Sequence, residues 1–185
     1  MTIRLAAPLQ SDSVVDGYGI RTVIWTQGCS HNCPFCQNPQ THDFLGGEVY
    51  DIQDVLNEID ELKNQDGITL SGGDPLFQIE PVLEIVKHCK QNSLNVWCYT
   101  GFTYERILEM CHTNPMYKEF LENIDVLVDG RFEIAKKNLN LLFRGSENQR
   151  LIDMPKTLSE GKVVLLEEKS DIISDFKETK EKMYI

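Results

Sequence analysis

The chain has 185 residues, a formal net charge of −11 at pH 7, 41% apolar residues and 25% charged residues. This composition is typical of one globular domain with a real core, and it has no cluster of Lys and Arg of the kind that binds nucleic acid. The longest apolar runs, such as 163–166, are far too short to span a bilayer, so we expect no membrane partner. The first residues lack a signal-peptide pattern, so we expect a cytoplasmic protein whose six cysteines are metal ligands or free thiols.

The first half of the chain alternates between strand and helix patterns. Residues 22–27 are rich in β-branched and aromatic side chains, and they predict a strand that leads directly into a cysteine-rich loop. Asp51 has the residue type of an N-cap, and apolar residues at helical spacing follow it as far as Leu62. Residues 67–71 predict a second strand, which ends at a Gly-Gly-Asp-Pro turn. A second helix follows, with an apolar face made of Ile79, Val82, Leu83 and Val86.

The same alternation continues in the second half. It predicts a strand over 94–100, a helix over 103–111, a strand over 124–128 and a final strand over 163–166. Residues 131–155 are less regular, although 139–143 has the composition of a short strand. The sequence thus indicates a single domain over residues 1–166. The tail over residues 167–185 is highly charged, and we expect it to be helical or disordered.

Strands that alternate with helices indicate βαβ units and therefore an α/β fold with a mostly parallel sheet. A complete (β/α) barrel needs about 250 residues, so we expect an open partial barrel here. Parallel α/β folds place their sites at the carboxyl ends of the strands. Four motifs are expected at that edge: the cysteine loop, Gly72-Gly73-Asp74, Tyr99-Thr100-Gly101 and Asp129-Gly130.

The loop after the first predicted strand holds Cys29, Cys33 and Cys36 in a C-x3-C-x2-C pattern. Thiolates this close in sequence bind one metal centre only if the backbone wraps around it, and three is one short of the four ligands that close a tetrahedral site or a cubane cluster. A centre with an open coordination position is suited to bind a ligand and transform it. The spacing matches neither the paired ligands of structural zinc sites nor the bacterial ferredoxin pattern.

This cysteine segment closely resembles the signature of radical S-adenosylmethionine (SAM) enzymes. The resemblance implies a [4Fe-4S] cluster held by three cysteines, with SAM bound to the fourth iron and cleaved reductively to a 5′-deoxyadenosyl radical. The alternative is a zinc site of the Cys3His type, completed by His31 or His42. His31 lies between two ligating cysteines, where reaching the same metal is sterically awkward, whereas His42 is within reach.

The turn at Gly72-Gly73-Asp74 is the second candidate binding element. Glycines allow a backbone to approach a ligand closely, and a carboxylate beside them can accept from an ammonium group. Radical SAM enzymes carry Gly-Gly-Glu at this place, where it holds the amino group of SAM. The resemblance therefore implies SAM binding by Gly73, with support from Gly72 and from Asp74, whose side chain is one methylene shorter than Glu.

Phe35 directly precedes the last cysteine of the loop. Its simplest role is to pack against the protein and anchor the loop. The family resemblance places Phe35, Cys36 and Gln37 against the adenosine of SAM, and both roles can hold together. The remaining cysteines share no close spacing, so we expect buried free thiols at Cys89, Cys98 and Cys111.

Outside the cysteine loop, other segments resemble a smaller group within the radical SAM enzymes. Residues 16–21 (Asp-Gly-Tyr-Gly-Ile-Arg), followed by Trp25 and by Gly28-Cys29, resemble the leader of glycyl-radical-enzyme activases, and Asn38 completes that pattern. Two departures are conservative: Trp25 stands where Phe or Leu is usual, and the tyrosine stands where Pro is common.

Residues 125–132 and 143–153 resemble the C-terminal half of the activating proteins of anaerobic (class III) ribonucleoside-triphosphate reductases. The string from Arg144 to Arg150 is either a polar loop that closes the rim of the barrel or a contact to SAM or to the reductase. The resemblance implies an enzyme that abstracts a hydrogen atom from a glycine Cα of that reductase. It also implies an electron donor such as flavodoxin. Whether the chain forms a homodimer is left open.

Three alternatives remain at this stage. The chain could activate another glycyl-radical enzyme, such as pyruvate formate-lyase. It could be another compact radical SAM enzyme with a small purine-like substrate, although the string from Arg144 to Arg150 is not expected there. It could also be a non-catalytic zinc or iron–sulfur module.

Overall fold

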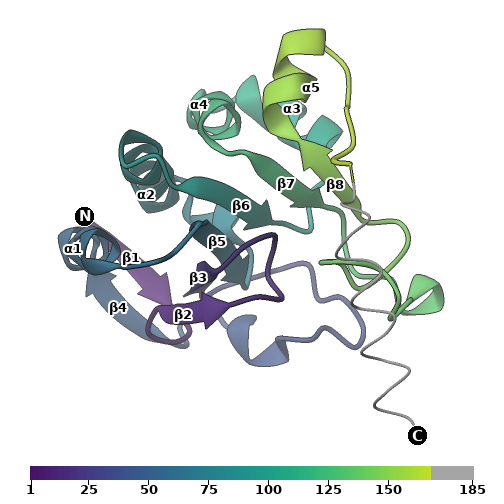
Figure 1. Ribbon diagram of the computed structural model, residues 1–185. Helices are drawn as coiled ribbons and strands as arrows, with labels where there is room; N and C mark the ends of the chain where they lie inside the picture. The colour runs from purple at the N-terminus through teal and green to yellow at the C-terminus, as the bar shows by residue number, and fades with distance from the viewer. Residues whose placement is uncertain (168–185) are drawn as a thin grey trace, which may run out of the picture.

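One mixed sheet organises residues 1–167, the part of the chain that the computed structural model describes. Its strands follow the order β4-β1-β3-β5-β6-β7-β8, and β2 pairs with β3 outside this path (Figure 1). The strands are β1 (Thr2–Leu5), β2 (Gln10–Ser13), β3 (Arg21–Thr26), β4 (Glu48–Asp51), β5 (Gly67–Gly72), β6 (Asn95–Tyr99), β7 (Val126–Asp129) and β8 (Arg150–Asp153).

The centre of the sheet is parallel. Strands β3, β5, β6 and β7 pair in parallel in that order. Strands β1 and β2 pair with β3, and β8 with β7, in antiparallel fashion, and β4 pairs antiparallel with β1. The predicted α/β class and mostly parallel central sheet are therefore confirmed, and the curvature of a partial barrel stays a prediction. Because the central strands run in one direction, the loops at their carboxyl ends meet at one edge.

The helices lie along one side of this sheet (Figure 1). They are α1 (Ile52–Glu61), α2 (Ile79–Gln91), α3 (Tyr104–Cys111), α4 (Met116–Asn123) and α5 (Met154–Glu160), with short 3-10 turns η1 (Pro39–Thr41), η2 (Pro75–Gln78) and η3 (Ile134–Lys136). Asp51 is the N-cap of α1 as predicted, and its carboxylate accepts from the backbone N–H of Gln53 at 2.9 Å. Within residues 1–167 no helix has the length and apolar character needed to cross a membrane.

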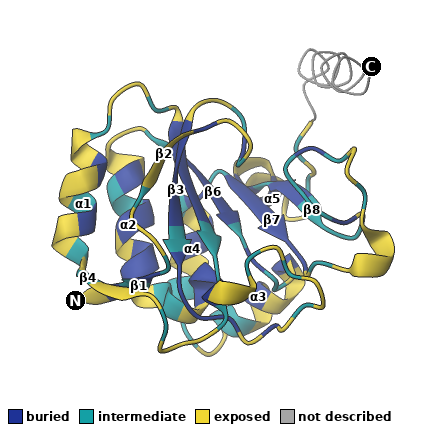
Figure 2. Ribbon diagram, turned by 90° about the horizontal axis from the view of Figure 1, so that it is seen from below, coloured by how far each residue is buried: buried dark blue, intermediate teal, exposed yellow. Residues whose placement is uncertain are grey.

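Alternation along the strands divides the apolar residues between the two faces of the sheet (Figure 2). On β6, Val96 and Cys98 join the large core under the helices, to which all five α-helices contribute. On the same strand, Trp97 belongs to a smaller cluster on the opposite face with Val128 of β7 and Leu151 of β8. The sheet is thus buried on both faces, which explains the near-continuous apolar runs of β6 and β7.

Arg21 is buried at the end of the sheet that lies away from the cysteine loop. It is 1% exposed, and burial lowers its pKa to about 10. Its Nε donates to Thr69 Oγ1 at 2.7 Å, its Nη2 donates to the Ile68 carbonyl at 2.6 Å, and its guanidinium lies 5.3 Å from the centre of the Trp97 ring. A Cβ on Gly17 would lie 2.9 Å from Arg21 Cδ, so the glycine-rich leader can wrap this arginine closely.

Two predicted strands are wrong. Residues 139–143 form turns and bends, and Leu139 is exposed. In 163–166 only Leu165 makes a bridge, to Ile152 of β8, so this segment lies along the outer edge of β8 without forming a strand. The sequence did not predict β8, because the polar residues of the string from Arg144 to Arg150 run directly into this short strand. Beyond Glu167, the predicted tail lies outside the described residues.

Candidate functional site

A cavity of about 440 Å³ lies at the carboxyl edge of the parallel strands. Its walls come from all four predicted motifs: the cysteine loop after β3, Gly72 and Gly73 after β5, Tyr99 to Gly101 after β6, and Gly130 after β7. The convergence expected from the strand pattern is therefore confirmed. Residues between 141 and 149 also contribute to the lining.

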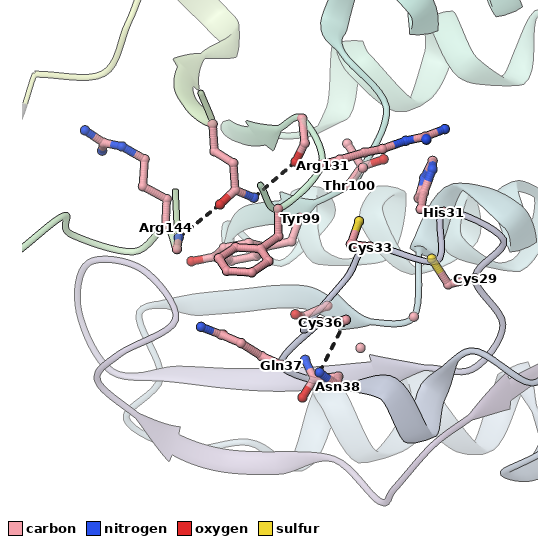
Figure 3. A pocket seen from close by; sticks show the side chains of 18 of the residues that line it. Cys29, His31, Cys33, Cys36, Gln37, Asn38, Tyr99, Thr100, Arg131 and Arg144 are labelled. Carbon is pink, nitrogen blue, oxygen red and sulfur yellow. Dashed lines mark hydrogen bonds between the residues drawn. The ribbon is translucent and has the colours of Figure 1, made fainter. Parts of the chain in front are cut away.

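All three cysteines of the loop line this cavity, and Figure 3 shows the sulfur atoms of Cys29 and Cys33. The backbone N–H of Cys29 donates to the His42 carbonyl at 3.1 Å, which ties the start of the loop to its end. The backbone N–H of Cys36 donates to the Cys33 carbonyl at 3.1 Å, which forms a tight turn between these cysteines. Cys29 is buried, and Cys33 and Cys36 are half-buried. One loop therefore brings the three cysteines to a single cavity, and the metal site that their spacing predicts stays a prediction.

Burial favours the protonated form of two of these thiols, those of Cys29 and Cys33. It raises the pKa of Cys29 to about 11, although the backbone amide of His31 has the smaller, opposite effect of lowering that pKa. Burial also raises the pKa of Cys33, while the backbone amide of Phe132 and the charge of Arg131 lower it. Metal ligation requires thiolates, so a cationic centre would supply the positive charge that this site needs. Among residues 1–167, no three His, Cys, Asp or Glu side chains converge closely enough to form a ready-made site for a single ion.

The residues that flank the last cysteine lie in different environments. Gln37 and Asn38 line the cavity, and the backbone N–H of Asn38 donates to Cys36 Sγ at 3.4 Å (Figure 3). Phe35 is 78% exposed, with a positive φ of 60°. The packing role that the sequence allowed for Phe35 is therefore wrong, because this ring buries little surface in the chain itself.

Gly72 and Gly73 line the cavity and also touch the neighbouring backbone. Gly72 has a φ of +99°, and a Cβ there would lie 2.5 Å from the Thr26 carbonyl oxygen. A Cβ on Gly73 would lie 2.5 Å from the Gly28 carbonyl oxygen. The backbone N–H of Asp74 donates to that same oxygen at 3.0 Å. The glycines therefore allow this turn to lie directly against the base of the cysteine loop.

Asp74 points into the protein and is not among the residues that line the cavity. Its side chain is 1% exposed. Its carboxylate accepts from Thr100 Oγ1 at 2.8 Å, from the Gly101 N–H at 2.9 Å and from the Leu76 N–H at 3.0 Å. His31 Nε2 lies 2.7 Å from the same carboxylate. The structure thus places this acid behind the wall of the cavity.

The string from Arg144 to Arg150 forms a loop that closes the rim. Arg144, Gly145 and Gln149 line the cavity. Gln149 Oε1 accepts from the Gly145 N–H at 3.0 Å, and Gln149 Nε2 donates to the Gly130 carbonyl at 3.1 Å. The side-chain amide therefore joins this loop to the loop after β7. The rim-closing role that the sequence left open is thus observed for this segment.

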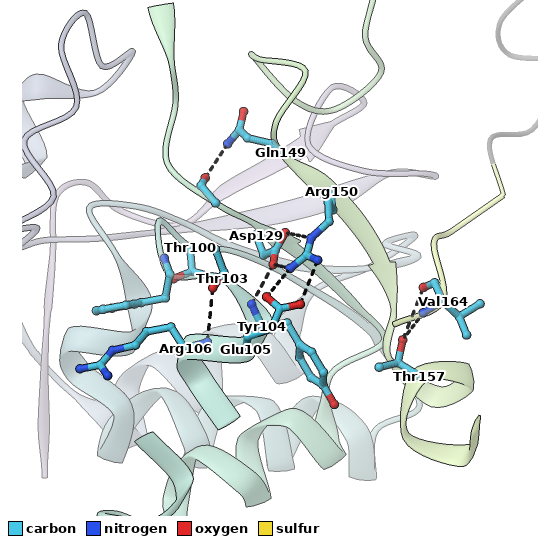
Figure 4. A network of polar contacts seen from close by, with 12 residues as sticks. Thr100, Thr103, Tyr104, Glu105, Arg106, Asp129, Gln149, Arg150, Thr157 and Val164 are labelled. Carbon is cyan, nitrogen blue, oxygen red and sulfur yellow. Dashed lines mark hydrogen bonds and ion pairs between the residues drawn. The ribbon is translucent and has the colours of Figure 1, made fainter. Parts of the chain in front are cut away.

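Arg150 lies behind the rim in a network of ion pairs (Figure 4). It binds Asp129 through Nε at 3.0 Å and Glu105 through both Nη atoms at 3.0 and 2.8 Å. Asp129 also accepts from the Tyr104 N–H at 2.8 Å. Hydrogen bonds to Asp129 and Glu105 raise the pKa of Arg150, and the bond to Arg150 lowers the pKa of Glu105. The network joins β7, β8 and the start of α3 under the site.

Of three charged residues in the cavity lining, Arg131 was missed by sequence reasoning, whereas Asp16 lies in the leader segment and Arg144 begins the string that runs to Arg150. Figure 3 shows both arginines at the cavity. For Arg131 a signal was present, because it follows Asp129-Gly130 at the carboxyl end of a predicted strand. Of the other cysteines, Cys89 and Cys98 are buried as predicted, and Cys111 is half-buried.

Comparisons with known proteins agree with this site. A model of a 4Fe-4S single cluster domain matches residues 15–152. Three curated relatives are each named anaerobic ribonucleoside-triphosphate reductase-activating protein. The relative from Pasteurella multocida (strain Pm70) is 34% identical over 146 residues, covering 74% of this chain and 89% of the relative. The relative from Enterobacteria phage T4 is 34% identical over 145 residues, covering 74% and 86%.

The relative from Escherichia coli (strain K12) is 31% identical over 144 residues, covering 74% of this chain and 90% of the relative. Among solved structures, QueE from Escherichia coli is similar with a TM-score of 0.46 and 17% identity, covering 56% of this chain and 54% of that chain. The chain therefore belongs to the family of anaerobic ribonucleoside-triphosphate reductase-activating proteins, and it carries a 4Fe-4S single cluster domain.

Proposed function

We propose that this chain is a radical SAM enzyme that activates an anaerobic ribonucleoside-triphosphate reductase by forming its glycyl radical. The observation that carries the proposal is the set of thiols from Cys29, Cys33 and Cys36, which share one cavity with no other cysteine among its described lining residues. Three thiolates can hold three corners of a cubane and leave one iron for a ligand. When bound, a reduced [4Fe-4S] cluster supplies the electron that cleaves SAM and so yields the 5′-deoxyadenosyl radical that takes hydrogen from glycine.

The cavity suits a ligand of the size of SAM. Its volume of about 440 Å³ falls within the range of small-molecule sites. We assign the methionine end of SAM to the backbone of Gly72 and Gly73. Arg131 and Arg144 bring positive charge to the same space, which favours a carboxylate. Asp74 supports this end indirectly, by fixing the turn that carries Gly73.

We assign the adenosine end to the segment after Cys33. Cys36 and Gln37 line the cavity, and Gln37 offers both a donor and acceptors to a purine edge. Phe35 is exposed beside them, where its ring is available to stack on a ligand or on a protein substrate.

The partner follows from the names of the relatives, which are activating proteins of anaerobic ribonucleoside-triphosphate reductases. Val15 both lines the cavity and is 66% exposed, so it offers an apolar contact at the mouth for a segment of a protein substrate. The reaction requires one electron per turnover from a donor such as flavodoxin.

The test is electron paramagnetic resonance on anaerobically reconstituted, reduced protein, with and without SAM. We expect an iron–sulfur signal that changes when SAM is added, and a glycyl radical doublet once the reductase is present. A doublet formed with pyruvate formate-lyase but not with the reductase would identify the other activase class. One tightly bound zinc and no iron–sulfur signal would overturn the enzymatic proposal.

A further inference from the structure

A buried pair of side chains joins the cysteine loop to the turn after β5. His31 Nε2 lies 2.7 Å from Asp74 Oδ2, and the two side chains are 4% and 1% exposed. A carboxylate only accepts hydrogen bonds when ionised, so Nε2 of the imidazole carries the proton in this pair. Neither side chain is needed for ligation by the three cysteines, so the pair calls for a separate explanation.

Asp74 is held in place by groups from three segments. Its own turn contributes the Leu76 N–H, the loop after β6 contributes Thr100 Oγ1 and the Gly101 N–H, and the cysteine loop contributes His31. A buried carboxylate is stable only when its oxygens are fully hydrogen-bonded, and this one has that full set. Its position is therefore fixed, and so is the nitrogen that it binds.

The imidazole of His31 has one place to lie. Its ring packs against Phe77, at 5.6 Å between ring centres, and against Phe102, at 4.6 Å in an edge-to-face contact, and these two rings also contact each other. A Cβ on Gly101 would lie 2.4 Å from His31 Cδ2, so glycine is required for the loop to close on this ring. Packing and the bond to Asp74 thus define the same position of the side chain.

The backbone of His31 transmits this position to a cluster ligand. His31 lies between Cys29 and Cys33 in the loop, and it lines the same cavity as both cysteines. Hydrogen bonds and amide dipoles at the ligating sulfurs are among the features that set the reduction potential of iron–sulfur clusters. A side chain that fixes the loop backbone between two ligating cysteines therefore fixes the amides around their sulfurs, and through them it acts on the electronic properties of the centre.

We propose that Asp74 positions His31 and that His31 in turn sets the reduction potential of the centre held by the three cysteines. The inference rests on the proposed function, since it needs an iron–sulfur cluster at this site. It makes His31 and Asp74 positioning residues rather than ligands. It also gives Asp74 a role in which direct contact with SAM is not required.

The test measures iron content per chain and the midpoint potential of the cluster, by a redox titration monitored by electron paramagnetic resonance. We expect His31→Ala to keep its iron and to shift the potential to more negative values, because the backbone amides of the loop are held less firmly near the ligating sulfurs. His31→Gln, whose amide can donate to Asp74, should restore much of the wild-type potential.

The matched control is His88→Ala. His88 Nε2 also lies 2.7 Å from a carboxylate, that of Asp60, but this pair is on the surface of α1 and α2. The control should have the wild-type potential. An unchanged potential in His31→Ala, or a shift that His31→Gln does not reduce, would overturn the proposal.

If His31→Ala loses its iron, His31→Phe takes its place, because it fills the space beside the two rings without a donor. The potential of His31→Phe is then judged by the same two outcomes as that of His31→Ala. Iron loss in both His31→Ala and His31→Phe would show that the pair only supports the fold, and it would overturn the inference. Wild-type protein is measured first. A wild type without an iron–sulfur signal would refute the proposed function itself, whereas a SAM-responsive wild type with unshifted variants refutes only this inference.

Discussion

Gly73 touches the backbone of Gly28, since a Cβ on Gly73 would lie 2.5 Å from the Gly28 carbonyl oxygen. The turn after β5 and the base of the cysteine loop are therefore in direct contact. The same two segments are joined by the hydrogen bond from the Asp74 N–H to the Gly28 carbonyl. Any change that moves one of these loops must move the other.

The first prediction concerns Gly73→Ala. Because the obstructing atoms are backbone, we expect the cysteine loop to shift, iron incorporation to fall and the free energy of unfolding to drop by about 1–3 kcal/mol. Iron analysis and urea unfolding check both effects. Gly161→Ala is the control and should keep its iron, because a Cβ there meets nothing within 4 Å and its cost is only that of a positive φ, which Gly73 does not have. Full iron content in Gly73→Ala would show that the contact between the loops does not position the cysteines.

The second prediction concerns the cysteines. Cys33→Ala should abolish glycyl radical formation and remove the iron–sulfur signal, since two thiolates cannot hold the cluster in position. Cys111→Ala is the matched control, because Cys111 is also half-buried but lies at the end of α3, away from the cavity lining. Radical formation by Cys33→Ala on the reductase would contradict the proposed mechanism.

The third prediction concerns Arg21. Arg21→Lys should lower the free energy of unfolding by roughly 2–4 kcal/mol, because a lysine cannot reproduce the bonds of the buried guanidinium to Thr69 and Asn95. Urea unfolding of the two proteins measures the difference. Arg106→Lys, on the exposed face of α3, should change stability by less than about 0.5 kcal/mol. Equal losses in both variants would show that burial of Arg21 is unimportant.

The fourth prediction is a pH dependence. The bond to Arg150 lowers the pKa of Glu105 in the folded state, so this pair stabilises the fold above the unfolded pKa, which is near 4.3. That stabilisation is lost as the pH falls through the lowered folded-state pKa. Glu105→Gln should therefore destabilise the protein at pH 7 by roughly 0.5 kcal/mol, since Glu105 is more than half exposed, and by less at pH 4.

Urea unfolding at both pH values measures this difference. Glu109→Gln is the control, because Glu109 pairs with Arg106 on the exposed surface of the same helix. A loss of stability in Glu105→Gln that is the same at pH 7 and pH 4 would mean that its charge is not what binds Arg150.

The strands and helices that carry the site could be predicted because their signals are local. The strand before the cysteine loop and the strands that became β5, β6 and β7 are rich in apolar and β-branched residues, and the N-cap of α1 is a single residue type in front of a periodic pattern. The cysteine spacing needed only one loop to bring three thiols together. These features depend on neighbours in sequence, so the chain by itself determined them.

The edge strands and the partners of the charged residues could not be predicted in this way. Strands β1, β4 and β8 are four residues long, and each exists because a neighbouring strand offers an unpaired edge. An arginine is usually a surface residue, and only the folded sheet brings Arg21 its buried partners, which lie far along the chain. His31 and Asp74 are 43 positions apart, and neither segment alone indicates the other. Contacts of this kind form only when distant loops meet at one edge of the sheet, and so the tertiary structure decided which acid stands behind the cavity and which histidine it holds.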